Sequence, residues 1–137
     1  MKELGHFIGG NAVKGASGRY GDIYNPATGE VQAKVAFASR AEVRKAVEAA
    51  LTAFPGWAST NPQRRARVMF NFKALIEKNM DELAHMLSSE HGKVLADSRG
   101  DVQRGLEVIE FACGIPHLQK GEYTEGAGPG IDIYSMR

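Results

Sequence analysis

The sequence predicts an α+β chain with strands at both ends and helices in the middle. Most of the 16 glycines lie in residues 5–29 and 121–130, and such glycine-rich segments are typical of the tight turns that join strands. The long segment between them is poor in glycine and spaces its apolar residues as a helix does. Hydrophobic residues make up 43% of the 137 and charged residues 24%, a composition typical of folded proteins and not of disordered ones.

The first 38 residues carry the patterns of two β-hairpins. In the first, residues 7–8 and 12–13 flank the turn Gly-Gly-Asn, whose residues tolerate the positive φ of a tight hairpin turn. In the second, residues 19–24 and 31–37 flank the turn sequence Asn-Pro-Ala-Thr-Gly-Glu. Apolar side chains alternate along 31–37, which predicts a half-buried strand.

Three helices are predicted after the hairpins. The first begins at Ser39, because Ser-Arg-Ala-Glu is a capping box, and it ends at Pro55 and Gly56. The second begins at Pro62, where a first helical residue needs no N–H. The third runs from Asp81 to a stop near residues 91–93, where a glycine follows a histidine.

A fourth helix is predicted at about residues 94–119, with apolar residues on two sides. Leu106 and Cys113 belong to one stripe, and Arg104, Val108 and Phe111 lie on the opposite side at about 100° per residue. Two apolar stripes predict that both faces of this helix are covered.

The last residues predict a loop followed by a strand. Residues 121–130 are rich in glycine, and residues 131–137 alternate as a strand that ends without a turn or a partner. An open strand edge is an aggregation hazard. We therefore expect this chain to be part of a larger protein.

Composition excludes several classes of partner and site. Seventeen Lys and Arg balance sixteen Asp and Glu, so no overall field favours nucleic acid or an anionic membrane. No segment has the roughly 18 apolar residues of a membrane span, and the first residues lack the apolar segment of a signal peptide. The lone Cys113 cannot form an intrachain disulfide, and the four histidines show no metal-binding spacing. We expect a cytoplasmic protein with no metal site.

The residues offer few candidates for chemistry. Cys113 shares its stripe with Leu106, where a buried thiol stays protonated, so we expect a core residue and no catalytic residue in the chain. No Gly-x-Gly-x-x-Gly sequence follows a strand, so no cofactor-binding residue is assigned. Arg64, Arg65 and Arg67 could bind a phosphate, but cations are unfavourable at a helix N-terminus, and we favour pairing with carboxylates.

Arg104 is the polar residue best placed for binding. It shares its face with apolar residues, and a guanidinium removed from water needs an anion. Two anions are possible: Asp97 or Asp101 on the same helix, or a ligand carboxylate held by two parallel hydrogen bonds.

Several segments resemble the amino-terminal region of the aldehyde dehydrogenases, in the same order along about residues 5–137. They are Phe-Ile-Gly-Gly at 7–10, Asn-Pro-Ala-Thr-Gly-Glu-Val at 25–31, Gly-Trp at 56–57 with the arginine-rich 62–67, and Glu-His-Gly-Lys at 90–93. Within this superfamily, residues 101–112 and 121–125 are similar to the CoA-acylating methylmalonate-semialdehyde dehydrogenases.

The resemblance implies a parent enzyme of the α/β aldehyde dehydrogenase fold. Residues 1–137 would form the amino-terminal part of its cofactor-binding domain, and 121–137 would begin an oligomerisation strand of a homo-oligomer, a homotetramer. The catalytic domain, and every reactive residue of the family, would lie outside this chain. The chain alone would then be inactive, with the rest of its own polypeptide as a partner.

The resemblance also implies a reaction. A cysteine thiolate attacks methylmalonate or malonate semialdehyde, NAD accepts a hydride, CO2 is lost, and CoA receives the propionyl or acetyl group. The helix that carries Arg104 lines the substrate tunnel in this family, which makes Arg104 the expected ligand of the substrate carboxylate. Two alternatives stay open: part of a non-acylating aldehyde dehydrogenase, or a non-catalytic helical interaction module.

Overall fold

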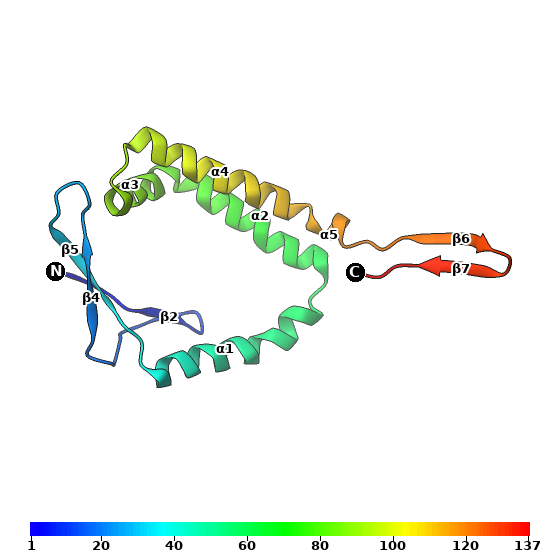
Figure 1. Ribbon diagram of the computed structural model, residues 1–137, viewed down its shortest axis with the longest axis horizontal. Helices are drawn as coiled ribbons and strands as arrows, with labels where there is room; N and C mark the ends of the chain where they lie inside the picture. The colour runs from blue at the N-terminus through cyan, green and yellow to red at the C-terminus, as the bar shows by residue number, and fades with distance from the viewer. The chain divides into compact units, whose positions relative to one another are not determined.

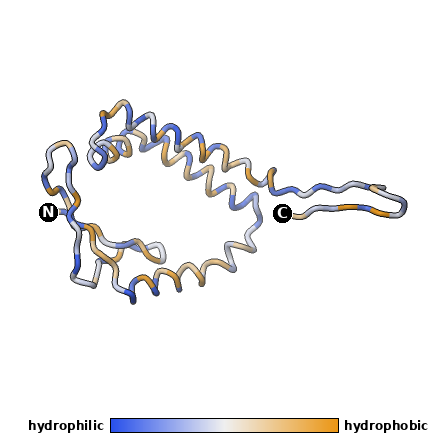
Figure 2. The backbone as a smooth tube through the Cα atoms, viewed as in Figure 1, coloured by the Kyte–Doolittle hydropathy of each residue, from blue (hydrophilic) through white to orange (hydrophobic).

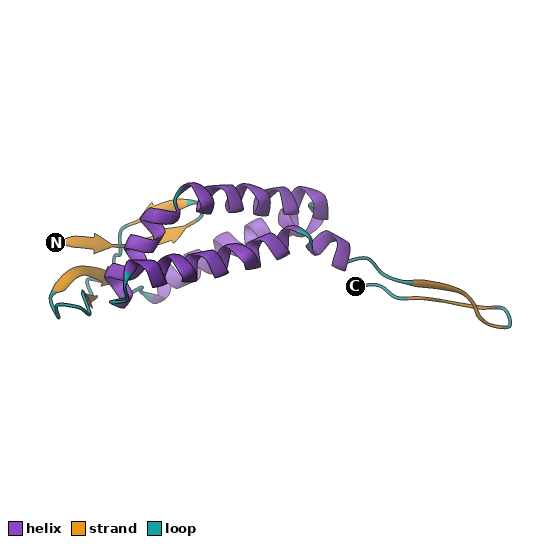
Figure 3. Ribbon diagram, turned by 90° about the horizontal axis from the view of Figure 1, so that it is seen from above, coloured by secondary structure: helices purple, strands orange, loops and turns teal.

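The computed structural model describes residues 1–137, with five helices and seven strands (Figure 1). The chain divides into two compact units. One comprises Met1–Thr60 and Asn79–Val102, and the other comprises Asn61–Lys78 and Gln103–Arg137. Strands lie at both ends of the chain and helices in the middle (Figure 3). The predicted α+β class is therefore confirmed.

A three-stranded sheet lies in the first unit, in the order β1 (Lys2–Leu4), β5 (Val31–Ala36) and β4 (Tyr20–Tyr24). The antiparallel pairing of β4 with β5 confirms the second predicted hairpin. Strand β1 was not predicted, because its three residues show no pattern and its parallel partner β5 is distant in sequence.

The predicted burial along β5 is wrong at its end. The alternation of apolar side chains along residues 31–37 predicted that Phe37 is buried and Ala36 exposed. In the structure Phe37 is exposed and Ala36 is buried. Gly15 explains the difference, because a β-carbon on it would collide with that of Ala36. The backbone at Gly15 thus covers Ala36 directly.

The first predicted hairpin is confirmed. Strands β2 (His6–Ile8) and β3 (Asn11–Val13) pair antiparallel. Gly9 and Gly10 at the turn have φ values of 59° and 80°, the positive φ that the sequence indicated.

Helix α1 (Arg40–Ser59) begins at the predicted capping box. Its predicted stop at Pro55 is wrong, because the helix continues through that residue to Ser59. Proline lacks the N–H that would donate to the carbonyl of Leu51, and its ring crowds that carbonyl, but neither effect ends the helix here. The turn beyond it is closed by Thr60, whose N–H donates to the Trp57 carbonyl over 3.1 Å.

The apolar face of α1 is largely exposed within this chain. Val43, Val47, Leu51 and Phe54 are each 52–65% exposed, and apolar residues recur along the whole helix (Figure 2). The helical spacing was predicted correctly, but no other part of the chain buries the stripe.

The start of the next helix and the end of the one after it lie at the residues that the sequence indicated, whereas that later helix begins one residue before the predicted Asp81. Helix α2 (Pro62–Lys78) follows Asn61, whose side-chain oxygen accepts a 2.8 Å bond from the N–H of Gln63. Helix α3 (Met80–His91) ends at Gly92, which has a φ of 85° and donates its N–H to the Ser88 carbonyl.

Helix α4 (Leu95–Cys113) packs its first turns against α3 through small residues. Ala84 on α3 and Ser98 on α4 are completely buried. The Ser98 hydroxyl lies 2.8 Å from that of Ser88 on α3.

The prediction of one continuous helix to residue 119 is wrong. Helix α4 ends at Cys113, and a short α5 (Ile115–Leu118) follows Gly114. The N–H of Gly114 donates to the Phe111 carbonyl over 3.0 Å, a tighter turn than an α-helix has. Pro116, which has no N–H, prevents the regular pattern from resuming across this point.

The glycine-rich segment near the end is a strand and not the predicted loop. Strand β6 (Tyr123–Gly128) pairs antiparallel with β7 (Ile131–Tyr134), so the terminal strand has its partner within the chain. Asp132 on β7 accepts hydrogen bonds from the Tyr123 hydroxyl and the Gly126 N–H, both over 2.9 Å. Glycine has a low strand propensity, and the sequence pattern therefore did not indicate β6.

Candidate functional site

The candidate site is the exposed face of α4 that carries Arg104. Val108 and Phe111, four and seven residues further on, are each 67% exposed, and Arg104 is exposed as well. Leu106 on the other side is only 5% exposed. The expectation that both faces of this helix are covered is therefore wrong within this chain. Arg104 therefore shares an exposed face of α4 with apolar side chains.

Asp97 and Asp101, the two carboxylates near the start of α4, both form ion pairs with Lys93. The Lys93 ammonium lies 2.9 Å from Asp97 and also binds Asp101, and its side chain is only 16% exposed. The hydrogen bonds that the Lys93 ammonium donates to Asp101 and then to Asp97 raise the pKa of Lys93. These are the two carboxylates that the sequence offered to Arg104. The spacing of four residues between Lys93 and Asp97 could have indicated the first of these pairs, whereas Asp101 lies a further four residues along the chain.

The three arginines of α2 do not form the expected pairs with carboxylates inside the chain. None of the ion pairs involves Arg64, Arg65 or Arg67. The Arg67 guanidinium instead lies 5.8 Å from the centre of the Phe70 ring, a distance at which a cation is attracted to an aromatic face.

Of the four histidines, His6 is the only one that is not exposed. His6 is half-buried, and its Nε2 lies 3.7 Å from a carboxylate oxygen of Glu42. Bonds from the Ser39 backbone and hydroxyl and from the Ala16 backbone lower the pKa of Glu42 to about 2. Cys113 is half-buried, in keeping with a position on the apolar stripe of α4.

The structure offers no nucleotide cradle within this chain. The strand that runs into a helix is β5, and the connection to α1 at residues 37–39 reads Phe-Ala-Ser. Without glycine it lacks the close backbone approach that a pyrophosphate needs. No group of three His, Cys, Asp or Glu side chains could hold a metal ion, and no helix is long and apolar enough to cross a membrane.

Several curated proteins similar to this chain are named as dehydrogenases of malonate or methylmalonate semialdehyde. Malonate-semialdehyde dehydrogenase of Pseudomonas aeruginosa is 44% identical over 98% of this chain. The acylating, mitochondrial methylmalonate-semialdehyde dehydrogenase of Arabidopsis thaliana is 48% identical over 96% of it. The chain spans 27% and 22% of the length of these two relatives.

Solved structures show the same likeness in three dimensions. A Sinorhizobium meliloti structure in complex with NAD, assigned as a methylmalonate-semialdehyde dehydrogenase, is 64% identical and matches all of this chain with a TM-score of 0.91. Methylmalonate-semialdehyde dehydrogenase of Oceanimonas doudoroffii is 46% identical over 99% of the chain, also with a TM-score of 0.91. This chain covers 28% of each.

The comparisons confirm the resemblance that the sequence motifs indicated, and with it a part of the aldehyde dehydrogenase fold. The family model that matches residues 12–137 is that of the aldehyde dehydrogenases, which are oxidoreductases. The chain therefore belongs to the aldehyde dehydrogenase family.

Proposed function

We propose that this chain is part of an NAD-dependent, CoA-acylating dehydrogenase of methylmalonate or malonate semialdehyde, and that Arg104 binds the carboxylate of the substrate. The relatives support the substrate class, because their names specify malonate or methylmalonate semialdehyde. The observation that carries the role of Arg104 is its position on the exposed apolar face of α4.

This face suits a substrate with a carboxylate at one end and an aldehyde at the other. Val108 and Phe111 offer apolar surface for the short carbon chain. Once the surface is closed off from water, the attraction between guanidinium and carboxylate strengthens. The planar guanidinium can donate two parallel hydrogen bonds to a carboxylate, which fixes the direction in which the substrate lies.

The chemistry of oxidation and acyl transfer is assigned to residues outside this chain. The NAD complex of a relative supports NAD as the cofactor, and the word acylating in a relative's name supports CoA as the acyl acceptor. The residues 37–39 that lead into α1 do not fit a dinucleotide, so the binding of NAD is assigned to the rest of the longer enzyme. In this proposal the chain positions the substrate, is inactive alone, and functions in the cytoplasm.

The hairpin of β6 and β7 supports a role in assembly. Both strands are almost entirely exposed, and their outer edges carry unpaired backbone groups that can extend a sheet in another chain. We assign residues 121–137 to oligomerisation of the longer enzyme, and 1–137 to the amino-terminal part of its cofactor-binding domain.

The role of Arg104 is tested with Arg104→Leu in the longer enzyme that contains this sequence. We expect kcat/KM for methylmalonate semialdehyde to fall by about 30-fold or more, because a buried carboxylate loses its cation. Propionaldehyde, which has no carboxylate, should lose far less. Arg104→Lys should rescue only partly, since an ammonium cannot form the two-pronged contact.

The matched control is Arg99→Leu, which removes an equally long cation from the same helix. Arg99 binds Asp81 on α3 over 2.8 Å, so its loss should lower stability slightly and leave the ratio of the two substrates unchanged. Equal losses on both aldehydes for Arg104→Leu would refute carboxylate binding. They would favour a structural pairing of Arg104 with Asp97 or Asp101 instead.

A further inference from the structure

Arg65, the fourth residue of α2, is half-buried and has no carboxylate within ion-pair distance. The other half-buried basic side chains each have at least one. Their pairs are His6 with Glu42, Lys34 with Asp22, Lys73 with Glu77 and Glu110, and Lys93 with Asp97 and Asp101. A basic group that is partly removed from water is normally paired with an acid. Arg65 is therefore the exception in this chain.

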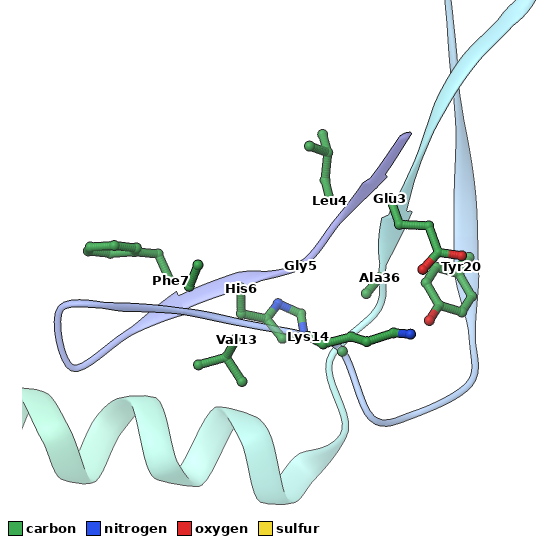
Figure 4. A pocket seen from close by; sticks show the side chains of 11 residues that line it. Glu3, Leu4, Gly5, His6, Phe7, Val13, Lys14, Tyr20 and Ala36 are labelled. Carbon is green, nitrogen blue, oxygen red and sulfur yellow. The ribbon is translucent and has the colours of Figure 1, made fainter. Parts of the chain in front are cut away.

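The guanidinium of Arg65 also lacks a hydrogen-bond acceptor at one of its nitrogens. Its Nε is buried and has no hydrogen-bond partner. A second nitrogen of this kind, Nε2 of His6, lies 3.7 Å from Glu42, at a cavity of about 560 Å³ that Glu3 also lines (Figure 4). Arg65 has no such carboxylate, so its charge is partly removed from water without an anion to balance it.

The carboxylates of the helices next to Arg65 already have partners. Glu77 is the only acidic residue of α2, which carries five basic residues, and it binds the Lys73 ammonium over 2.5 Å. Glu110 on α4 lies 3.4 Å from the same ammonium. The positive end of the α2 dipole also lies at the start of this helix, where cations are unfavourable. The balancing anion for Arg65 must therefore come from elsewhere.

We propose that Arg65 binds a carboxylate from a segment of the longer polypeptide that lies outside residues 1–137. This inference rests on the proposal that the chain is part of a longer enzyme. The chain spans 28% or less of the relatives described above, so most of such a polypeptide is available to supply the acid. A carboxylate suits the site because a guanidinium can donate two parallel hydrogen bonds to it. Because Nε is covered, the terminal nitrogens are the ones that the carboxylate approaches.

The two neighbouring arginines do not require such a partner. Arg64 and Arg67 are both exposed, so water can solvate their charges, and Arg67 lies over the ring of Phe70. Arg64 is thus a matched control for Arg65, because it is the adjacent residue, of the same type and on the same helix, and differs in its exposure.

The first test is the melting temperature of the longer enzyme. Arg65→Met keeps an unbranched apolar side chain but removes the charge, and leaves the bound carboxylate unpaired. We expect the melting temperature to fall by about 4 °C or more. Arg64→Met should change it by about 1 °C or less, as is usual for an exposed charge. Equal effects of the two substitutions would overturn the proposal.

The second test identifies the carboxylate directly, and does not depend on stability. In Arg65→Lys the new amine lies where the guanidinium was, and a carbodiimide joins an amine to a carboxylate that touches it. We expect an amide between α2 and an Asp or Glu outside residues 1–137, in a product that migrates as a single chain on a denaturing gel. Arg64→Lys should not form this amide.

The other outcomes of this experiment would overturn the proposal. An amide to a carboxylate within residues 1–137, or no amide at all, would show that no outside segment meets Arg65. A product of twice the chain mass would place the carboxylate in a neighbouring subunit.

A dissociable anion is the remaining occupant to be tested. If inorganic phosphate raised the melting temperature of the unmodified longer enzyme but not that of Arg65→Met, Arg65 would be a ligand site, and the proposal would be overturned. None of these measurements uses a substrate, so they can fail while the Arg104 test of the proposed function succeeds, and the reverse.

Discussion

The contact between α3 and α4 includes a buried pair of hydroxyls, which is suitable for a quantitative test. Ser98 is completely buried, and its hydroxyl lies 2.8 Å from that of Ser88. Ser88→Ala removes the partner and leaves the Ser98 hydroxyl in a site closed to water. An unsatisfied buried hydroxyl costs about 1–3 kcal/mol, and we expect the free energy of unfolding to fall by about that amount.

The reverse substitution should cost less. Ser88 is half-buried, so after Ser98→Ala its hydroxyl can reach water, and we expect a loss of about 0.5–1.5 kcal/mol. In the double variant neither hydroxyl remains, and the loss should be close to that of Ser98→Ala alone. The two substitutions should therefore be coupled by about 1–3 kcal/mol, the size of the Ser88→Ala loss, as expected of residues in contact.

The assay is urea unfolding of the intact protein, followed by circular dichroism, for the unmodified chain, both single variants and the double variant. The coupling is the difference between the double-variant loss and the sum of the single losses. Single losses that add within about 0.3 kcal/mol would refute the reasoning. They would show that Ser98 is satisfied by a carbonyl of its own helix, as serines in helices can be.

Three further predictions concern other parts of the chain. Because the pKa of Glu42 is lowered to about 2 in the folded protein from an ordinary 4.5, its stabilising effect should be complete above about pH 4.5 and be lost as the pH falls towards 2. Melting temperatures across this interval should show less pH dependence in Glu42→Gln. Gly15→Ala should lower the melting temperature, since the new β-carbon would collide with that of Ala36; Gly100→Ala, where nothing lies within 4 Å, should raise it through helix propensity. An equal effect of both would contradict this account. Deleting residues 131–137 from the longer enzyme should weaken its assembly, because β6 loses its partner, and an unchanged sedimentation coefficient would contradict the assembly role.

The sequence predicted elements well where the signal is local. The capping box at Ser39, the start of α2 after Asn61 and the end of α3 at Gly92 each depend on residues within one turn of the helix. The glycines of the first hairpin act in the same local way. These positions could be predicted because the chemistry of the cap or turn does not require knowledge of the rest of the fold.

The sequence singled out one residue of the candidate site, and its role stays a prediction. Arg104 stood out because a cation occurs among apolar residues at helical spacing, and the structure places it on one face with Val108 and Phe111. The spacing of residues along a helix shows which side chains share a face, but it does not show whether another part of the protein covers that face. The structure shows it exposed, and it also shows Lys93 bound to both candidate carboxylates.

The sequence by itself determined where most helices begin, which residues share a helix face, and, through its motifs, the aldehyde dehydrogenase resemblance. Only the tertiary structure decided the parallel pairing of β1 with β5, the strand β6, and the contact of His6 with Glu42 across 36 residues. The physical reason is that capping and turn energies arise within a few residues. Strand pairing, burial and ion pairs depend instead on groups that only the folded chain brings together.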